Sequence, residues 1–286
     1  MVASTATPSV GSFRGVRLIV LTLLVGVLLP THGTSQTVYP RSTETEWVYS
    51  EISDQIIQIS APDGTSQLES HRDGVLEVTF PDPSRARAVY RSLVLGLVTP
   101  EGAVTPRTDG ALGLPFTLAF GDRGYEGTTS APEFPPEFDA LPDLTRQFED
   151  FFMPLPVESL AIGVEWTDTA TVTETTEEED VRRSTVRTLV VTGDTIVDGT
   201  PAWVVATRAE LELSVRSHVE ELQADAVSTL AGVETGSFVF SKSGVMLART
   251  REGELRGQLT YILADGELPF EQSHVYTTTI TLLDSR

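Results

Sequence analysis

The stretch Leu255-Arg-Gly-Gln-Leu-Thr-Tyr-Ile-Leu-Ala-Asp-Gly266 contains the pattern that decides the fold. Apolar or small residues occupy every second position of its first nine residues, and the positions between them are polar except for one isoleucine. This period of two is typical of a strand with one buried face. Asp265-Gly266 supplies the positive φ of a tight hairpin turn, and the β-branched run Val275-Tyr-Thr-Thr-Thr-Ile-Thr-Leu-Leu283 follows. The stretch therefore predicts an antiparallel hairpin.

The same two signals recur along the chain, because further Asp-Gly pairs and Lys242-Ser-Gly244 stand between alternating segments. The other pairs are at 63–64, 73–74, 109–110 and 198–199. Short turns join neighbours in an antiparallel sheet, whereas parallel strands need helical crossovers. We therefore predict an all-β fold, a large curved antiparallel sheet or half-barrel, with two short helices. The expected strands lie near 46–60, 65–71, 75–80, 93–98, 114–120, 124–129, 164–174, 182–192, 201–216, 236–241, 245–250, 254–264 and 271–283.

The two helices are predicted after Asp82-Pro83 and over 142–152. An N-cap acid followed by a first-turn proline is typical of a helix start. In the second segment, Leu144 and three phenylalanines recur at helical spacing before Pro154 ends the pattern. We expect this second helix to pack on the concave face of the sheet.

Phenylalanine is concentrated in and just before the second helix, where five of the twelve phenylalanines lie within nineteen residues. One interpretation is a lid whose aromatic face closes over a cavity in the curved sheet. The other is a core helix that plugs the open end of the sheet, and an apolar stripe at helical spacing is core more often than site. The candidate ligand-binding residues are Phe148, Phe151, Phe152 and Tyr261.

The N-terminal segment has the order of an export signal. Its first seventeen residues contain two arginines and no acid, and they lead into the apolar run Leu18–Leu29 before Pro30. A membrane span needs about 20 apolar residues, so this run is too short for an anchor, the alternative interpretation. We predict a signal peptide over 1–35 and an exported β-rich domain over 36–286, located in the periplasm or outside the cell.

Composition restricts the partners of the exported domain. The net charge of −21 becomes −21 − 2 = −23 once the two arginines of the signal are removed, which argues against a nucleic-acid partner. The chain has no cysteine for a disulfide or a lipid anchor. No later run is long enough for a membrane span. The proline-rich stretch near 131–142 is a possible internal domain boundary.

Motifs for catalysis are absent from the sequence. It has no G-x-G, no G-x-S-x-G and no S-x-x-K, and its three histidines after the signal have no metal-ligand spacing. We therefore predict no metal and no cofactor. Paired-carboxylate hydrolysis stays open, because it needs only two acids in a cleft. The acidic run Glu177–Asp180 is interpreted as a solvated hairpin tip.

Three segments resemble exported bacterial β-sheet families of unknown function. They are Leu155–Trp166, Val197–Val205 and Gly236–Met246, and the resemblance covers roughly 114–283. The outline is also similar to the bacterial lipoprotein-carrier and related lipid-binding clam folds, in which helices cover the concave face of a curved sheet. No residue of a defined binding motif carries over, so this resemblance implies a function by fold analogy alone.

These observations together favour an exported, non-enzymatic binding protein. Its partner would be an apolar small molecule or lipid, or another envelope protein, held in the curved sheet. The alternatives are a structural or interaction protein of the cell envelope and, less favoured, a carboxylate-dependent hydrolase. A carrier requires a cavity, a structural protein a filled core with an exposed patch, and a hydrolase a cleft with converging carboxylates.

Overall fold

A computed structural model describes most of the chain after the N-terminal segment. The chain divides into two units, 1–34 and 35–286, and all described residues belong to the second. The predicted signal peptide and most of the possible boundary at 131–142 lie outside the described residues. Within the described part there is no helix with the length and apolar character that crossing a bilayer requires. The described residues are 39, 45–62, 64–121, 123–134, 144, 148–176, 179–219, 223–264 and 266–286.

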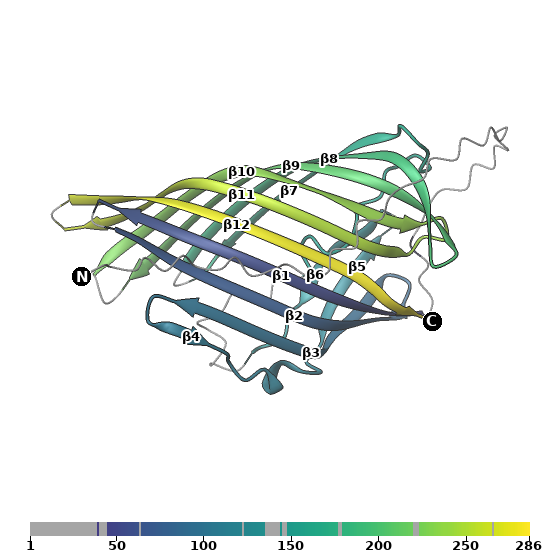
Figure 1. The fold of residues 1–286 in the computed structure, drawn as a ribbon, viewed down its shortest axis with the longest axis horizontal. Helices are drawn as coiled ribbons and strands as arrows, with labels where there is room; N and C mark the ends of the chain where they lie inside the picture. The colour runs from purple at the N-terminus through teal and green to yellow at the C-terminus, as the bar shows by residue number, and fades with distance from the viewer. Residues whose placement is uncertain are drawn as a thin grey trace, which may run out of the picture. The chain divides into compact units, whose positions relative to one another are not determined.

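The described part is built on one antiparallel sheet of twelve strands (Figure 1). The strands run in the order β6-β5-β3-β2-β1-β12-β11-β10-β9-β8-β7, and β4 pairs with β3. Their bounds are β1 Glu46–Ala61, β2 Gly64–Asp82, β3 Arg85–Thr99, β4 Gly102–Val104, β5 Phe116–Gly121, β6 Gly124–Ser130, β7 Glu165–Thr175, β8 Glu179–Val197, β9 Thr200–Val219, β10 Ala224–Ser241, β11 Met246–Leu263 and β12 Gly266–Ser285.

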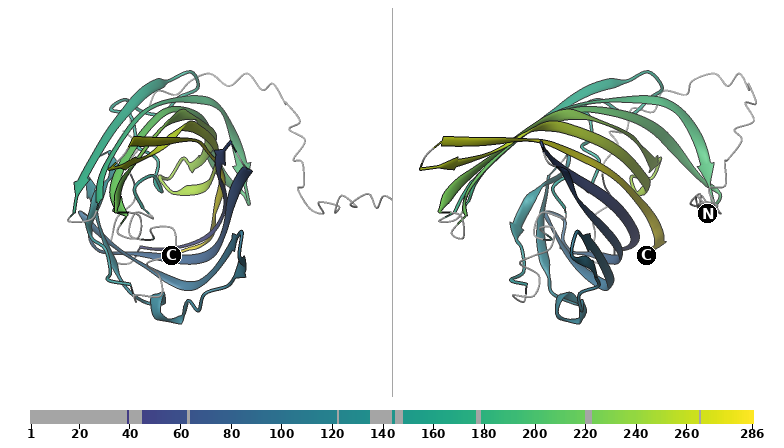
Figure 2. Two further views of the ribbon diagram at one scale, coloured as in Figure 1. Left: turned by 90° about the vertical axis from the view of Figure 1, so that its left-hand side faces the viewer. Right: turned by 60° about the vertical axis from the view of Figure 1, so that its left-hand side comes forward.

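The first and last long strands meet in the middle of the sheet. β1 and β12 pair from Trp47↔Ser285 to Ser60↔Glu271, so two sequential meanders join along this seam. β6 and β7 are the outermost strands of the order, and they do not pair in the described part of the chain. Figure 2 shows the sheet curling strongly about its concave face. The predicted curved antiparallel sheet is therefore correct.

Glycines allow the close backbone approach at β10 and β11 that sharp coiling of a sheet requires. A Cβ on Gly257 would lie 1.8 Å from the Thr229 carbonyl oxygen, and one on Gly232 would lie 1.9 Å from the Glu254 carbonyl oxygen. Real side chains do not tolerate such distances, so these strand positions accept only glycine in the present geometry. Glycine in a strand interior commonly marks a close approach or a tight bend.

Replacing Gly257 by alanine is expected to destabilise the protein by about 1 to 3 kcal/mol, because the backbones must separate to admit the methyl group. Gly127 in β6 is a matched control, since a Cβ there meets no atom within 4 Å. Urea midpoints of the two alanine variants test the difference. Equal midpoints would contradict this account of the curvature.

The main core fills one end of the concave face, where β1 begins and β12 ends. Aromatic rings dominate it and meet edge to face, as in the Trp47–Phe80 pair at 4.8 Å and the Tyr39–Phe240 pair at 5.1 Å between centroids. Toward the hairpin tips at the opposite end this core stops. A second apolar cluster of Ala209, Leu211, Leu230 and Leu255, with Leu213 and Tyr276 packed against it, lies there.

The helix predicted after Asp82-Pro83 is wrong, because this segment forms the turn between β2 and β3. The Asp82 Oδ1 atom accepts hydrogen bonds from the Ser84 backbone N–H (2.8 Å) and hydroxyl (2.7 Å). The acid thus caps a tight hairpin turn instead of a helix. Ala86, Ala88 and Tyr90 are then buried with the period of a strand.

The helix predicted over 142–152 is also wrong in its described part, Leu144 and 148–152, which contains no α-helix. Residues 148–152 form turns, with one backbone hydrogen bond from Phe151 to the Phe148 carbonyl at 3.2 Å. The successive side chains of Phe151, Phe152 and Met153 are all buried, which an irregular segment permits and a one-sided helix does not. The concave face is therefore covered here by the irregular segment 148–164. Among the described residues, 3-10 geometry occurs at Asp109–Ala111 and at Leu144, and no α-helix is present.

Some of the predicted turns are confirmed and one is wrong. Asp198 (φ 46°) and Gly199 (φ 81°) form a hairpin turn, and Gly244 (φ 99°) forms another, as predicted. The turn expected at Asp73-Gly74 is wrong, because Gly74 lies inside β2. The Tyr90 ring packs over it, at 3.1 Å from where a Cβ would stand.

Candidate functional site

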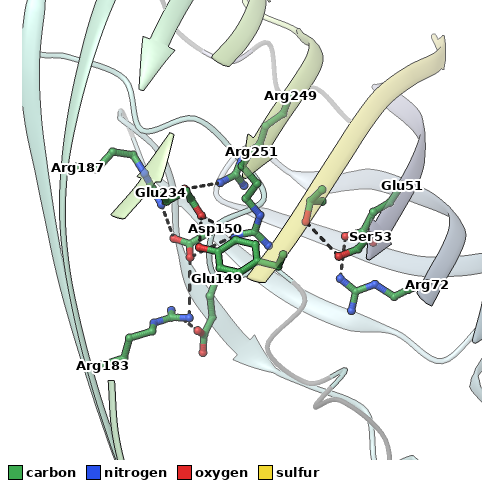
Figure 3. Close-up of polar contacts among 12 residues, drawn as sticks. Glu51, Ser53, Arg72, Glu149, Asp150, Arg183, Arg187, Glu234, Arg249 and Arg251 are labelled. Carbon is green, nitrogen blue, oxygen red and sulfur yellow. Dashed lines mark hydrogen bonds and ion pairs between the residues drawn. The ribbon is translucent and has the colours of Figure 1, made fainter. Parts of the chain in front are cut away.

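Charged side chains from several strands gather on the concave face (Figure 3). On β11 they lie between Met246 of the main core and Leu255 of the second cluster. Strand periodicity places them there: Arg249 and Arg251 are two apart on β11, and Arg183 and Arg187 are four apart on β8. Even spacing puts each pair on one face of its strand. Together with Glu234 of β10 and with Glu149 and Asp150 of the irregular segment, these arginines form what we term the charged belt.

Two carboxylates hold the arginines of the belt together. Asp150 Oδ1 lies 3.1 Å from Arg187 Nη2, and Asp150 Oδ2 lies 3.8 Å from Arg251 Nη1. Glu234 Oε1 lies 3.7 Å from Arg187 Nη2 and 3.8 Å from Arg249 Nη2, while its Oε2 lies 3.5 Å from Arg251 Nη1. The same Oε2 accepts a hydrogen bond from the Tyr276 hydroxyl at 2.8 Å.

The centre of the belt is buried. The side chains of Glu234 and Arg249 are 3% and 2% exposed. Burial alone would raise the pKa of Asp150, but Arg187, Arg183 and Arg251 lower it below its usual range. Burial, with the positive charges of Arg251 and Arg187, lowers the pKa of Arg249 to about 9, which leaves its guanidinium charged at neutral pH. Buried charges persist only when they are paired, so each member of the belt depends on the others.

A separate ion pair stands on the other side of the concave face. Arg72 Nη2 of β2 donates to Glu51 Oε1 of β1 at 2.9 Å, and the Glu51 side chain is 1% exposed. Burial would lower the pKa of Arg72, but Glu51 raises it above its ordinary value. The Arg72 guanidinium therefore stays charged.

A cavity of about 300 Å³ lies between the belt, the Arg72–Glu51 pair and the second cluster. Its volume is at the lower end of the range of small-molecule sites. Leucines, arginines, carboxylates and small polar groups line it side by side, since Leu95 pairs with Arg72 and Leu213 pairs with Arg183 across neighbouring strands. The lining side chains include Leu95, Leu144, Leu211, Leu213, Leu255, Ser53, Gln55, Ser70, Arg72, Asp150, Arg183, Glu234, Arg251, His274, Tyr276 and Thr278.

Several buried donors near the cavity have no hydrogen-bond acceptor among the described residues. They are the hydroxyls of Tyr49 and Tyr90, Nε of Arg72, Arg187 and Arg251, and Nη1 of Arg249. Of these residues, Arg72 and Arg251 line the cavity. Chemically, the surroundings of the cavity offer donors and positive charge to an oxyanion, next to an apolar wall.

Comparisons with known proteins show no family for this chain. No family model matches the sequence, and no curated protein matches it. Among solved structures, one described as lipid-protein interactions in lipovitellin is similar over 86% of this chain and 26% of that chain, with 12% identity and a TM-score of 0.49. This chain thus spans about a quarter of the length of that lipovitellin chain.

Two further structures cover most of both chains at lower similarity. Neisserial surface protein A is 8% identical over 82% of this chain and 96% of its own, with a TM-score of 0.24. A DUF1329 family protein from Desulfovibrio piger is 10% identical over 86% of each chain, with a TM-score of 0.12. Because these scores are low, the likenesses carry no argument about function. The resemblance noted in the sequence is therefore supported only as an all-β curved sheet.

The structure brings three of the four predicted ligand-binding residues together. Phe148, Phe151 and Phe152 are all buried in the main core, with ring centroids of Phe151 and Phe152 4.9 Å apart. Tyr261 lies apart from them, toward the hairpin tips, where its ring meets Phe270 at 5.7 Å. None of the four lines the cavity. Their role in binding a ligand stays a prediction.

The charged belt is the functional feature that the sequence reasoning missed. Arg183 and Arg187 follow the acidic run at 177–180, and the sequence alone predicted no role for them. Of that run, Glu179 and Asp180 are exposed, and Glu177 and Glu178 lie outside the described residues. Arginines at spacings of two and four within strands that otherwise bury apolar residues were the available signal. The described residues contain no group of three or more side chains suited to a metal ion.

Stability is expected to fall in mild acid because of His274, which lines the cavity. Burial lowers its pKa below the ordinary value of 6.5, and its Nε2 accepts a hydrogen bond from Gln55 Nε2 at 2.8 Å. As the pH falls through 6.5, His274 of the unfolded chain takes up a proton before His274 of the folded protein does. The free energy of unfolding therefore decreases from this pH down to the folded-state pKa.

Urea midpoints between about pH 7.5 and pH 5 measure this slope, and His274→Gln should reduce it. The exposed His218 is the control, and His218→Gln should keep the part of the pH dependence that comes from His274. An unchanged slope in His274→Gln would contradict the assignment.

Proposed function

We propose that the chain is an exported, non-enzymatic protein that binds a ligand with an apolar part in the cavity on its concave face. The observation that carries this proposal is the cavity of about 300 Å³ between the charged belt and the second cluster. Leu211, Leu213 and Leu255 form an apolar wall at a place where the main core has ended. A sheet that needed only to be filled would continue its core across this position.

A hydrolytic function receives less support from the same cavity. Asp150 and Glu234 converge on it, as the alternative of a carboxylate-dependent hydrolase requires. However, hydrolysis by a carboxyl pair needs one member with a raised pKa that donates a proton. The arginines around Asp150 lower its pKa, which suits an ion-pair partner and not a proton donor.

A purely structural function also receives less support. Exposed apolar residues occur on the outer face, including Ile56 (38% exposed) and Val98 (44%). Ile56 pairs with Val275 of β12, which is 42% exposed, but Glu69 of β2 and Glu254 of β11 stand on either side of this pair. Small groups of exposed apolar residues are normal on protein surfaces, and no broad patch forms among these described strands.

An uncharged fluorescent probe such as N-phenylnaphthylamine tests the proposed binding. We expect the probe to gain fluorescence with the parent protein, and we expect Leu213→Trp to abolish this gain by filling the cavity. Ile196→Trp is the control, because Ile196 is 71% exposed and outside the cavity. Absence of probe binding by the parent protein, or equal binding by the two tryptophan variants, would contradict the proposal.

Export rests on the short apolar run after two arginines. We expect intact-mass analysis of the protein from its source to show a chain that begins between Thr34 and Thr37. Retention of Met1 would show an uncleaved segment, and the proposal of export by a cleaved signal would then be wrong.

A further inference from the structure

The lining of the cavity changes in chemistry along the strands. Arg72 and Arg251 lie at one level of the sheet, because the pairs Arg72↔Ser53, Ser53↔Thr278 and Thr278↔Arg251 connect them. Leu255 lies four residues further along β11 from Arg251, and Leu211 lies beside it across Gly232 of β10. A ligand that fills this space therefore meets an apolar surface and two guanidinium groups at once.

Both of these arginines have an unused buried donor. Arg72 binds Glu51 through Nη2, and Arg251 approaches Asp150 and Glu234 through Nη1, while Nε of each has no hydrogen-bond partner among described residues. Asp150 and Glu234 are shared with other arginines of the belt, and Glu51 pairs with Arg72. The side chains of Arg72 and Arg251 line the cavity and are 17% and 22% exposed, and oxyanions are the acceptors that bind guanidinium groups most strongly.

The apolar side of the cavity continues along β11 toward the hairpin tips. Leu255, Leu259 and Tyr261 share one face of this strand because they are separated by even numbers of residues, and Gly257 between them adds no side chain. The Tyr261 ring meets Phe270 at the far end of this row. The row is suited to a narrow chain of methylene groups.

We infer that the cavity binds a single-chain amphiphile with an oxyanion head, a carboxylate or a phosphate. The head accepts hydrogen bonds from Arg72 and Arg251, and the chain lies over Leu211, Leu213 and Leu255 toward Tyr261. This inference rests on the proposed function, since it names the class of ligand for the same cavity.

Donors, and not an excess of positive charge, provide the selectivity. The belt and Arg72 together provide five arginines. Five acids stand near them: Glu51, Glu149, Asp150, Glu234 and, through its charge on Arg187, Asp168. The head therefore enters a site in which positive and negative side chains are equal in number, although the protein as a whole is strongly acidic. A hydrogen bond to a charged group contributes about 1.5 to 3 kcal/mol, so we expect a preference of about ten- to a hundredfold over a neutral head.

Isothermal titration calorimetry with decanoate, decyl phosphate and decanol tests the inference on the parent protein. We expect at least one of the two oxyanions to bind about ten- to a hundredfold more tightly than the alcohol, and the better one identifies the head. Equal binding of all three would overturn the inference and leave the proposed function intact. No binding of any of them, together with no probe binding, would overturn both.

Two substitutions locate the head. Arg251→Gln should reduce decanoate binding to the level of decanol, whereas Arg256→Gln on the same strand should not, because Arg256 is 75% exposed and outside the cavity. The double variant Glu51→Gln with Arg72→Gln removes an ion pair without leaving either charge alone. If Arg251→Gln does not fold, this double variant provides the test, and we expect it to bind decanoate with a smaller preference over decanol. If either Arg251→Gln or the double variant folds and still prefers decanoate over decanol as the parent protein does, the placement of the head at Arg72 and Arg251 is wrong.

Discussion

Replacing Glu234 by glutamine is expected to lower the free energy of unfolding by about 3 to 5 kcal/mol, the usual cost of removing one partner from a buried ionic cluster. Glu234 is 3% exposed and lies within 4 Å of three arginines, Arg187, Arg249 and Arg251. Removing its charge leaves these guanidinium groups with Asp150 as their nearest counter-charge in a water-poor environment.

The control for this change is Glu254→Gln on β11. Glu254 is 49% exposed and contacts Arg256 at the surface, where an ion pair contributes about 0 to 1 kcal/mol. Chemical denaturation of both variants gives the comparison. A loss of less than about 1 kcal/mol for Glu234→Gln would show that the belt is hydrated and not a buried cluster.

Replacing Phe151 by alanine is expected to destabilise the protein by about 3 to 5 kcal/mol, because the ring is packed on all sides. Its centroid lies 5.4 Å from that of Tyr49, 5.3 Å from that of Phe148 and 4.9 Å from that of Phe152. The side chain is 1% exposed, so truncation would leave a void that its neighbours cannot fill without moving.

This substitution also separates the two interpretations of the phenylalanine-rich segment. If the rings plug the sheet, stability falls and binding of an apolar probe to the remaining folded protein is unchanged. If they line a ligand site, the cost to stability is about 1 kcal/mol and probe binding weakens. Ile196→Ala serves as a control, since Ile196 is 71% exposed and outside the cavity.

The sequence predicted the sheet because its signals are local. Alternation along β11 and β12 and the turns at Asp198-Gly199 and Lys242–Gly244 depend only on neighbours in the chain. Asp82-Pro83 was misread because an N-cap acid and an acid in a hairpin turn accept the same kind of backbone hydrogen bond. The helix expected at 142–152 failed because a helical spacing of phenylalanines also suits an irregular segment that is surrounded by core.

The site was not predicted because it is assembled from distant parts of the chain. Arg72, Asp150, Arg187, Glu234 and Arg251 come together only when the sheet curls and the 148–164 segment covers its concave face. Each of them, taken alone in the sequence, has the pattern of an exposed charge: Arg187 lies in an expected strand, Asp150 in the expected helix, and the other three just outside expected strands. Only the burial that the curvature imposes distinguishes them from surface residues such as Arg256.

Native mass spectrometry of the protein purified from its source tests the central claim most directly. The account predicts a species heavier than the polypeptide by the mass of one single-chain amphiphile, which denaturation releases and which Leu213→Trp lacks. A parent protein that carries only the mass of its own polypeptide, and that takes up no decanoate, decyl phosphate or decanol when these are added, would contradict it.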